Sequence, residues 1–218
     1  MTSRTRIKFC GITNPDDAKK AIRIGADAIG MVFFSKSKRA VSLAQAKAVR
    51  EVIPPFVDVV ALFVNPDEDY VREVIETVSP DLLQFHGTES PQSCERYGIA
   101  YLKAFHIGAP GLEFRDEVLT QCRRYPSARG WLFDSYSTGF GGSGQGFDLS
   151  LLGTVRNAPD ARPMILAGGL TSESVAEKMR LLRPFAVDVS SGIEDAPGQK
   201  SEDKMRAFAE AVQKGDIV

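Results

Sequence analysis

The chain has 218 residues, of which 43% are hydrophobic, enough for one sizeable core and close to the upper limit for a single domain. The 27 basic and 28 acidic side chains give a formal net charge of −1, which excludes a broad basic surface for nucleic acid. The first residues, MTSRTRIKFCGIT, lack the apolar stretch of a signal peptide, and no apolar run approaches a membrane span. We therefore expect a cytoplasmic protein with no nucleic-acid or membrane partner, forming one domain over residues 1–218.

Cysteine usage agrees with a reducing compartment. The chain has three cysteines, Cys10, Cys94 and Cys122. Their odd number, wide spacing and lack of a CxxC pair argue against a disulfide framework and against a structural zinc site. Cys94 and Cys122 fall in predicted helices, where we expect them to be packing residues.

Short apolar, β-branched runs recur along the chain, and each is followed by a helix-like stretch. The runs are nearly all apolar rather than alternating, which suits parallel strands covered on both faces. The predicted strands are residues 6–10, 27–33, 57–64, 82–86, 101–106, 130–134, 163–169 and 186–191.

Helix signals lie between these strands. Asn14-Pro15 and Asn65-Pro66 each place a capping residue before a proline and two acids, a sequence that suits the first turn of a helix. Ser42 and Thr171 are predicted to open the helices SLAQAKAVREVI and TSESVAEKMRLL. Further helices are predicted after Ser90-Pro91, from about 112 to 124, around the segment FDLSLLGTVR and over 200–214.

Eight strand–helix units follow one another with no linker between them. Strict β-then-α alternation predicts a parallel sheet, and eight units in 218 residues predict an α/β fold of the compact (β/α)8 TIM barrel type. A doubly wound open sheet is the alternative, because it differs by a reversal of strand order that sequence does not reveal. In a barrel, functional residues are expected where the strands end and the βα loops begin.

Glycines follow the seventh and eighth predicted strands. Gly168-Gly169 stands just before a helix, and Ser191-Gly192 follows the last strand. Glycine lets backbone N–H groups approach an anion, a helix N-terminus adds a favourable dipole, and barrels commonly bind phosphate at these two loops. We predict a phosphorylated small-molecule ligand; the alternative is that the glycines only permit tight turns. The glycine-rich stretch 138–148 is expected to be a lid or rim over that ligand, or else a disordered loop.

Two strand ends carry groups suited to proton transfer. Asp134 ends an apolar strand, where a carboxyl group is costly unless paired or used, and partial burial would raise its pKa as a general acid requires. Cys10 ends the first strand, with Lys8 one step below on the same face, where an ammonium would favour the thiolate. The alternatives are a loop cap for Asp134 and simple packing for Cys10.

Three further polar side chains follow strands. His86 and His106 are the only two histidines, and they would form a metal site only if Asp134 completed the ligand set. We expect instead that both line the pocket or satisfy local hydrogen bonds, with no metal and no cofactor. Arg39 lies in the basic run SKSKRAVS, which is either a solvated loop or the clamp of a ligand carboxylate.

The segments KFCGIT, FFSKSKR, ALFVN, LQFHG, LFDS, GGSGQGFD, LAGGL and FAVDVSSGIE occur in this order through nearly the whole chain. With them the chain closely resembles the phosphoribosylanthranilate isomerases, the barrels of tryptophan biosynthesis. FCGIT and RPFAVDVSSGIE are specific, whereas LAGGL is shared with other phosphate-binding barrels. The resemblance implies a cofactor-free Amadori rearrangement of N-(5-phosphoribosyl)anthranilate to 1-(2-carboxyphenylamino)-1-deoxyribulose 5-phosphate, by a monomer or a homodimer.

The resemblance also implies roles for single residues. The family's general base after strand one matches Cys10, and its general acid after strand six matches Asp134. Its carboxylate-binding arginine matches Arg39, and its strand-eight aspartate, associated with the substrate, matches Asp188. The phosphate loops match Gly168, Gly169, Ser191 and Gly192, and His86 is placed in the substrate pocket by its strand end.

Three other functions fit parts of this pattern. A metal-dependent pentose-phosphate epimerase would need a fuller set of histidine and aspartate ligands than two histidines supply. The sugar isomerase of histidine biosynthesis performs the same rearrangement but has an aspartate base in place of Cys10. A barrel that only binds a phosphorylated metabolite would not require both Cys10 and Asp134 at strand ends.

Overall fold

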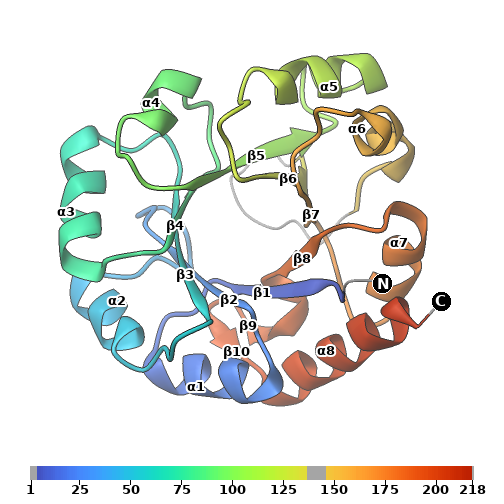
Figure 1. Cartoon of the computed structure of the whole chain (residues 1–218). Helices are drawn as coiled ribbons and strands as arrows, with labels where there is room; N and C mark the ends of the chain where they lie inside the picture. Colours follow the sequence, from blue (N-terminus) through green and yellow to red (C-terminus); the bar gives the residue numbers. More distant parts are fainter. Residues whose placement is uncertain (1–3, 137–145, 218) are drawn as a thin grey trace.

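The computed structural model describes residues 4–136 and 146–217, and these residues form a closed ring of eight parallel strands wrapped by helices (Figure 1). The strands are β1 (Arg6–Cys10), β2 (Ala28–Val32), β3 (Asp58–Phe63), β4 (Leu82–Phe85), β5 (Tyr101–Ile107), β6 (Gly130–Ser135), β7 (Met164–Leu166) and β8 (Ala186–Val189). The helices are α1 (Pro15–Ile24), α2 (Leu43–Arg50), α3 (Glu68–Val78), α4 (Pro91–Glu95), α5 (Arg115–Arg123), α6 (Gly153–Asn157), α7 (Val175–Leu182) and α8 (Glu202–Asp216).

The ring closes between its first and last strands. Each strand pairs in parallel with its neighbours in chain order, and β8 pairs with β1 through registers that include Lys8 opposite Asp188. This pairing confirms the predicted (β/α)8 barrel and excludes the open sheet, whose edge strands would be unpaired.

Side chains alternate between the inside of the barrel and the layer beneath the helices. On β1, Ile7 and Phe9 belong to the outer core with the helices, whereas Cys10 packs with Val32 and other inward residues. Phe133 lies in the outer core, as its place next to Asp134 predicts. The inside of the barrel is a smaller apolar cluster that includes Val60, Leu102 and Leu132, and polar side chains join apolar ones at its mouth.

Two predicted helix starts are wrong. Thr171 does not open α7; its N–H donates to the hydroxyl of Ser174 over 3.1 Å, and this turn delays the helix to Val175. Asn65 does not cap α3: it has a left-handed backbone with φ of 45°, and its side-chain oxygen accepts from the N–H of Thr88 at 2.8 Å. A tertiary hydrogen bond to the β4 loop therefore replaces the local cap, and α3 begins after Asp67.

The segment after β8 holds structure that the strand–helix pattern did not predict. A 3₁₀ turn, η2 (Ser191–Ile193), leads into the hairpin of β9 (Glu194–Ala196) and β10 (Gln199–Lys200). The predicted helix around FDLSLLGTVR is divided into a 3₁₀ turn, η1 (Leu149–Leu152), and α6. The predicted lid at 138–148 lies mostly outside the described residues.

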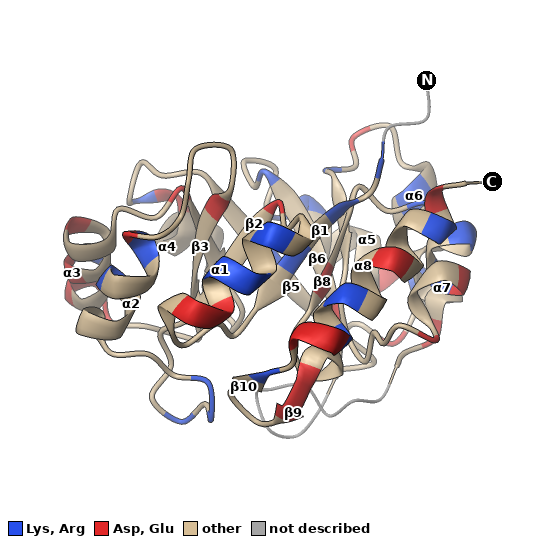
Figure 2. Cartoon of the chain, turned by 90° about the horizontal axis from the view of Figure 1, so that it is seen from below, with Lys and Arg blue, Asp and Glu red and all other residues tan. Residues whose placement is uncertain are grey.

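Figure 2 places the hairpin of β9 and β10 at one end of the barrel and the N-terminus toward the other. Figure 2 shows both basic and acidic residues on α1 and on α8, in keeping with the balanced charge. Among the described helices, none is long and apolar enough to cross a membrane.

Candidate active site

The carboxyl ends of the strands surround one cavity. Its lining includes Cys10, Arg39, His86, Asp134, Asp188, Gly168, Gly169 and Ser191. Gly192 does not line it, and neither does His106, which makes a local hydrogen bond to the carbonyl oxygen of His86. Residues from β1, β4, β6 and β8 and from their loops therefore meet at one place, as the barrel geometry requires.

Cys10 lies against Lys8 inside the barrel. The Lys8 Nζ donates to Asp188 Oδ1 at 2.9 Å, and both side chains are buried. Gly30 on β2 makes room for this group, because a Cβ there would lie 2.8 Å from Cys10 Sγ and 3.0 Å from Lys8 Nζ. The prediction that Lys8 and Cys10 share a face is confirmed, while the role of Gly30 had no signal in the sequence.

The thiol of Cys10 is not the ready thiolate that its position suggested. Burial raises its pKa above the ordinary 9.0, and the carboxylate of Asp188 acts in the same direction. The ammonium groups of Lys8 and, more weakly, Lys200 lower the pKa but do not overcome burial. The expected influence of Lys8 has the right sign, and the net direction of the pKa, which the sequence did not determine, is set by burial.

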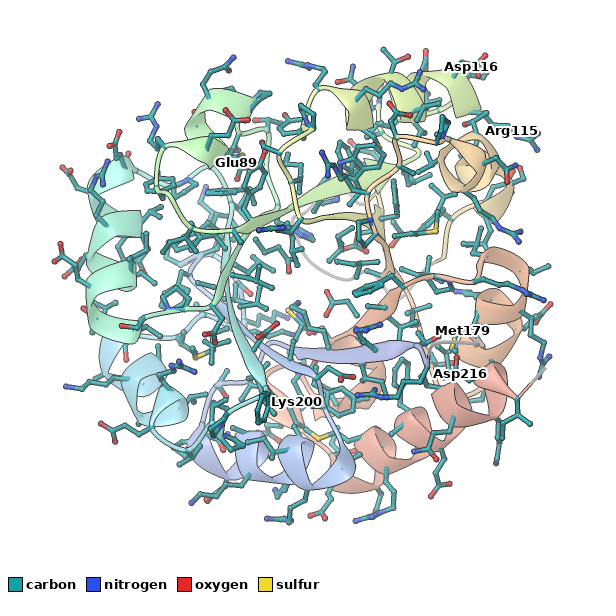
Figure 3. All side chains as sticks on the ribbon, viewed as in Figure 1. Glu89, Arg115, Asp116, Met179, Lys200 and Asp216 are labelled. Carbon is teal, nitrogen blue, oxygen red and sulfur yellow. The ribbon has the colours of Figure 1, made fainter. Side chains whose placement is uncertain are left out.

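Arg39 is held by a second buried carboxylate. Its Nε and Nη2 donate to the two oxygens of Glu194 at 2.8 and 2.7 Å. Glu194 also accepts from Lys200 Nζ at 2.7 Å, and Lys200, labelled in Figure 3, has a fully buried side chain. The arginine passes over Gly11, where a Cβ would lie 2.6 Å from Arg39 Cδ and where φ is +75°. The predicted clamp is therefore preorganised by the β9–β10 segment.

Asp134 meets both histidines. Its Oδ2 lies 3.2 Å from His86 Nε2, and its Oδ1 accepts from the N–H of Ser135 at 2.8 Å. Burial opposes ionisation of Asp134, but the hydrogen bond and charge of His86, then His106 and the Ser135 N–H, together hold its pKa below the ordinary 3.8. The predicted effect of burial has the right sign, but the net pKa is lowered rather than raised, because the strand pairing brings donors to the carboxylate.

His106 supports this group from β5. Its Nε2 lies 2.8 Å from the carbonyl oxygen of His86, and the two rings meet edge to face at 4.8 Å between centroids. Burial lowers the pKa of His106, and the neighbouring His86 acts in the same direction. His106 is therefore neutral at neutral pH.

The glycine loops after β7 and β8 pack directly against one another. Gly168 and Gly169 are both left-handed, with φ of 78° and 61°. A Cβ on Gly168 would lie 2.5 Å from the Ser135 nitrogen, and one on Gly192 would lie 2.1 Å from the Leu170 carbonyl oxygen. Gly192 thus serves loop packing rather than the cavity wall, and α7 begins too late to place its N-terminus directly after Gly169.

A buried ion pair fixes the loop that carries His86. Lys103 Nζ lies 3.0 Å from Glu89 Oε2 and donates to the Gly87 carbonyl at 2.7 Å. Glu89, labelled beside α4 in Figure 3, also accepts from the N–H groups of Gly87 and Asn65. A lysine and a glutamate 14 positions apart give no local signal of such a pair, so the sequence did not reveal it.

Fold and site together define a (β/α)8-barrel enzyme in which a buried thiol and a histidine-bound carboxylate, from strands β1 and β6, line one cavity. The family model described as N-(5'-phosphoribosyl)anthranilate (PRA) isomerase matches residues 7–211. An N-(5'-phosphoribosyl)anthranilate isomerase of Bordetella parapertussis is 56% identical over 215 residues, which is 99% of each chain. The chain belongs to the phosphoribosylanthranilate isomerase family.

Two solved structures share the architecture. A phosphoribosylanthranilate isomerase in complex with reduced 1-(o-carboxyphenylamino)-1-deoxyribulose 5-phosphate superposes with a TM-score of 0.83 at 34% identity, covering 96% of this chain and 98% of that one. Monomers generated from the dimeric enzyme of Thermotoga maritima give a TM-score of 0.82 at 32% identity, with the same coverage.

Proposed function

We propose that Cys10 and Asp134 are the base and the acid of the reaction that this family member catalyses. The chain is a phosphoribosylanthranilate isomerase of tryptophan biosynthesis, and it converts N-(5'-phosphoribosyl)anthranilate into 1-(2-carboxyphenylamino)-1-deoxyribulose 5-phosphate. The observation that carries the assignment of roles is that a thiol and a carboxyl group, each ending a barrel strand, line the same cavity.

The reaction needs one proton donor and one proton acceptor. Protonated Asp134 gives its proton to the furanose ring oxygen, and the ring C–O bond breaks to leave an open-chain Schiff base. The Cys10 thiolate then takes the proton from the sugar C2, which gives an enolamine. The enolamine tautomerises to the ketone product, so that no atom is gained or lost and no cofactor enters.

Lys8 supports the basic role of Cys10, because its buried ammonium is the largest of the influences that lower the pKa of the thiol against the effect of burial. His86 supports the acidic role of Asp134, because its imidazole is in contact with the carboxyl group and can return a proton to it. Asp188 holds the Lys8 ammonium under the thiol, and because it also lines the cavity it is placed to contact the substrate.

The two anionic ends of the substrate match two regions of the cavity. Arg39 faces it with its geometry set by Glu194, which suits the anthranilate carboxylate. Gly168, Gly169 and Ser191 line the same cavity and supply backbone N–H groups for the phosphate, and Gly192 allows the two loops to approach.

The activity is tested by supplying N-(5'-phosphoribosyl)anthranilate and following the loss of its fluorescence. Turnover that persists with excess chelator is expected, and it separates this reaction from a metal-dependent epimerase. A folded protein without turnover would contradict the isomerase assignment. Turnover that is lost when chelator is added would favour the metal-dependent epimerase.

We further propose that the chain forms a homodimer through the amino-terminal end of its barrel. The side chain of Phe56 is fully exposed there, on a left-handed backbone with φ of 71°. The same end has a cavity of about 250 Å³ whose lining includes Val60, Leu102 and Ile165. An exposed aromatic ring next to an apolar cavity suits an isologous contact, in which each Phe56 enters the partner's cavity.

Light scattering of Phe56→Asn tests the dimer. Asparagine tolerates the left-handed backbone, so the fold should remain while the mass falls from dimer to monomer. A monomeric unmodified chain, or a dimeric Phe56→Asn, would contradict this interface without touching the catalytic assignment.

A further inference from the structure

His86, His106 and Asp134 form a group with the composition of a metal site. The three residues end the neighbouring strands β4, β5 and β6 or follow them directly, and one ligand atom from each lies within 4.8 Å of the others. Imidazole nitrogen and carboxylate oxygen are the ligands that Zn²⁺ takes, and three protein ligands with open positions are typical of accessible zinc sites. The reaction scheme proposed above needs no metal, and it uses Asp134 and His86 but gives His106 no part.

The distances are close to those that an ion requires. In a tetrahedral zinc site with bonds of about 2.0 Å, two ligand atoms lie about 3.3 Å apart. His86 Nε2 and Asp134 Oδ2 already lie 3.2 Å apart. The other spacings in the group are at most 4.8 Å, so the ligand atoms reach tetrahedral spacing with side-chain adjustments of no more than about 1.5 Å.

Each ligand is oriented by a hydrogen bond from its own surroundings. Asp134 Oδ1 accepts from the Ser135 N–H, which turns Oδ2 toward His86. His106 Nε2 bonds to the His86 carbonyl oxygen, and His86 Nδ1 lies 3.1 Å from the side-chain amide of Gln84. Metal-binding imidazoles typically carry such a contact on their second nitrogen.

Gln84 also shows what must change when an ion binds. As placed, its Nε2 faces His86 Nδ1, so the proton of a neutral His86 is on Nε2, toward Asp134. Its Oε1 is buried and has no hydrogen-bond partner among the described residues. When Nε2 binds an ion, its proton moves to Nδ1 and the amide turns over, and Oε1 then accepts the Nδ1 proton. The ion thus gives the unpaired oxygen a donor.

We propose that His86, His106 and Asp134 bind a zinc-type divalent ion at the mouth of the barrel, and that this ion inhibits the isomerase. The protein supplies two nitrogens and one oxygen, and two of the three ligands, His86 and Asp134, line the same cavity as Cys10 and Arg39. The ion occupies the Asp134 oxygen that must carry a proton in catalysis. Inhibition rests on the acid role proposed for Asp134, whereas binding does not.

Binding is tested with Co²⁺ on the substrate-free, unmodified protein. The chain has only two histidines, so its imidazole NMR spectrum contains two sets of signals. Both sets are expected to shift together, at the same Co²⁺ concentration that produces visible absorption bands of a low-symmetry site. Signals that shift at different concentrations, or not at all, would overturn the site.

Two variants locate the ion. His106→Asn removes one ligand and is expected to weaken Co²⁺ binding at least about tenfold. Cys10→Ala is the matched control, because the thiol lines the same cavity but is outside the ligand set, and it should keep the absorption bands. Unchanged binding in His106→Asn, or bands lost in Cys10→Ala, would place the ion elsewhere.

Turnover supplies an independent readout. Zn²⁺ should inhibit the isomerase over the concentration range in which it displaces Co²⁺, and excess chelator should restore full activity. Binding without inhibition would leave the site standing but contradict the acid role of Asp134. Inhibition with no spectroscopic change would overturn the metal site itself.

Discussion

The two sides of the cavity hold their reactive groups in different ways. On the β1 and β8 side, the Cys10 thiol lies among permanent charges, the buried Lys8–Asp188 pair and Lys200. On the β4 to β6 side, Asp134 lies among two imidazoles and a backbone N–H. A buried thiol needs fixed cations beside it to ionise, whereas the carboxylate of Asp134 is held by hydrogen-bond donors.

This contrast leaves both groups in the wrong protonation state when the site is empty. Burial raises the pKa of Cys10 above 9.0, and hydrogen bonds hold that of Asp134 below 3.8. At neutral pH the free enzyme thus carries thiol and carboxylate, while the reaction needs thiolate and carboxylic acid. The active form, with its proton on Asp134 instead of Cys10, carries the same number of protons as the major form and is a minor part of the population.

The largest effect should come from removing either group. Cys10→Ala and Asp134→Asn are each expected to lower kcat by about 10²- to 10⁴-fold, because each removes one proton-transfer partner. Steady-state assays that follow the loss of substrate fluorescence measure kcat, and circular dichroism checks that the fold persists. Near-normal rates in both variants would refute the proposed roles.

Gly30→Ala should displace the Cys10 thiol and leave the Asp134 side of the cavity unchanged. The added methyl group would lie 2.8 Å from Cys10 Sγ and 3.0 Å from Lys8 Nζ, so the thiol must shift. A displacement of about 1 Å at a reacting group costs about a hundredfold in kcat. Gly153→Ala is the matched control, since nothing lies within 4 Å of its Cβ, and it should react normally. Equal rates in the two variants would argue against a precise placement of the thiol.

Arg39→Ala should weaken substrate binding more than turnover. A charged hydrogen bond to the anthranilate carboxylate contributes about 1.5 kcal/mol or more, so KM should rise about tenfold or more with a smaller change in kcat. Arg39→Lys keeps the charge but loses the two-point bond to Glu194, and its KM should be intermediate. An unchanged KM in Arg39→Ala would count against the clamp.

The pH dependence should be the smallest effect and the sharpest test of the contrast. When the base has the higher pKa and the acid the lower, the active fraction is constant between the two values. The unmodified enzyme should therefore keep a flat kcat/KM across neutral pH, falling only below the pKa of Asp134 and above that of Cys10.

In Asp134→Asn the fall above the pKa of Cys10 should vanish, because no acid proton has to be retained, and the residual kcat/KM should instead rise with pH up to the pKa of Cys10. Dividing one profile by the other, both recorded with chelator, removes the ionisations of the substrate. A ratio that does not change with pH would contradict the reversed protonation states.

Most of the barrel was predictable because its signals are local. The apolar runs mark the eight strands to within a few residues, and Cys10, Asp134 and Asp188 are found at or next to the strand ends where they were expected. The helix after β7 was placed four residues early, because the Thr171–Ser174 turn satisfies the same backbone groups that a helix start would.

The partners of the site residues were not predictable. Glu194 lies 155 positions from Arg39, and Asp188 lies 180 positions from Lys8, so no spacing connects them. The closeness of His86, His106 and Asp134 was named only as a condition for a metal site. It follows from the lateral pairing of β4, β5 and β6, which places His106 opposite Asp134.

The sequence by itself determined the order and type of the elements, the ends at which the polar residues lie, and the face that Lys8 and Cys10 share, because these depend on periodicity along the chain. Only the tertiary structure decided the direction in which the pKa values of Cys10 and Asp134 move. A pKa depends on the water excluded and the charges gathered around a group, and closure of the barrel brings those together from strands far apart in sequence.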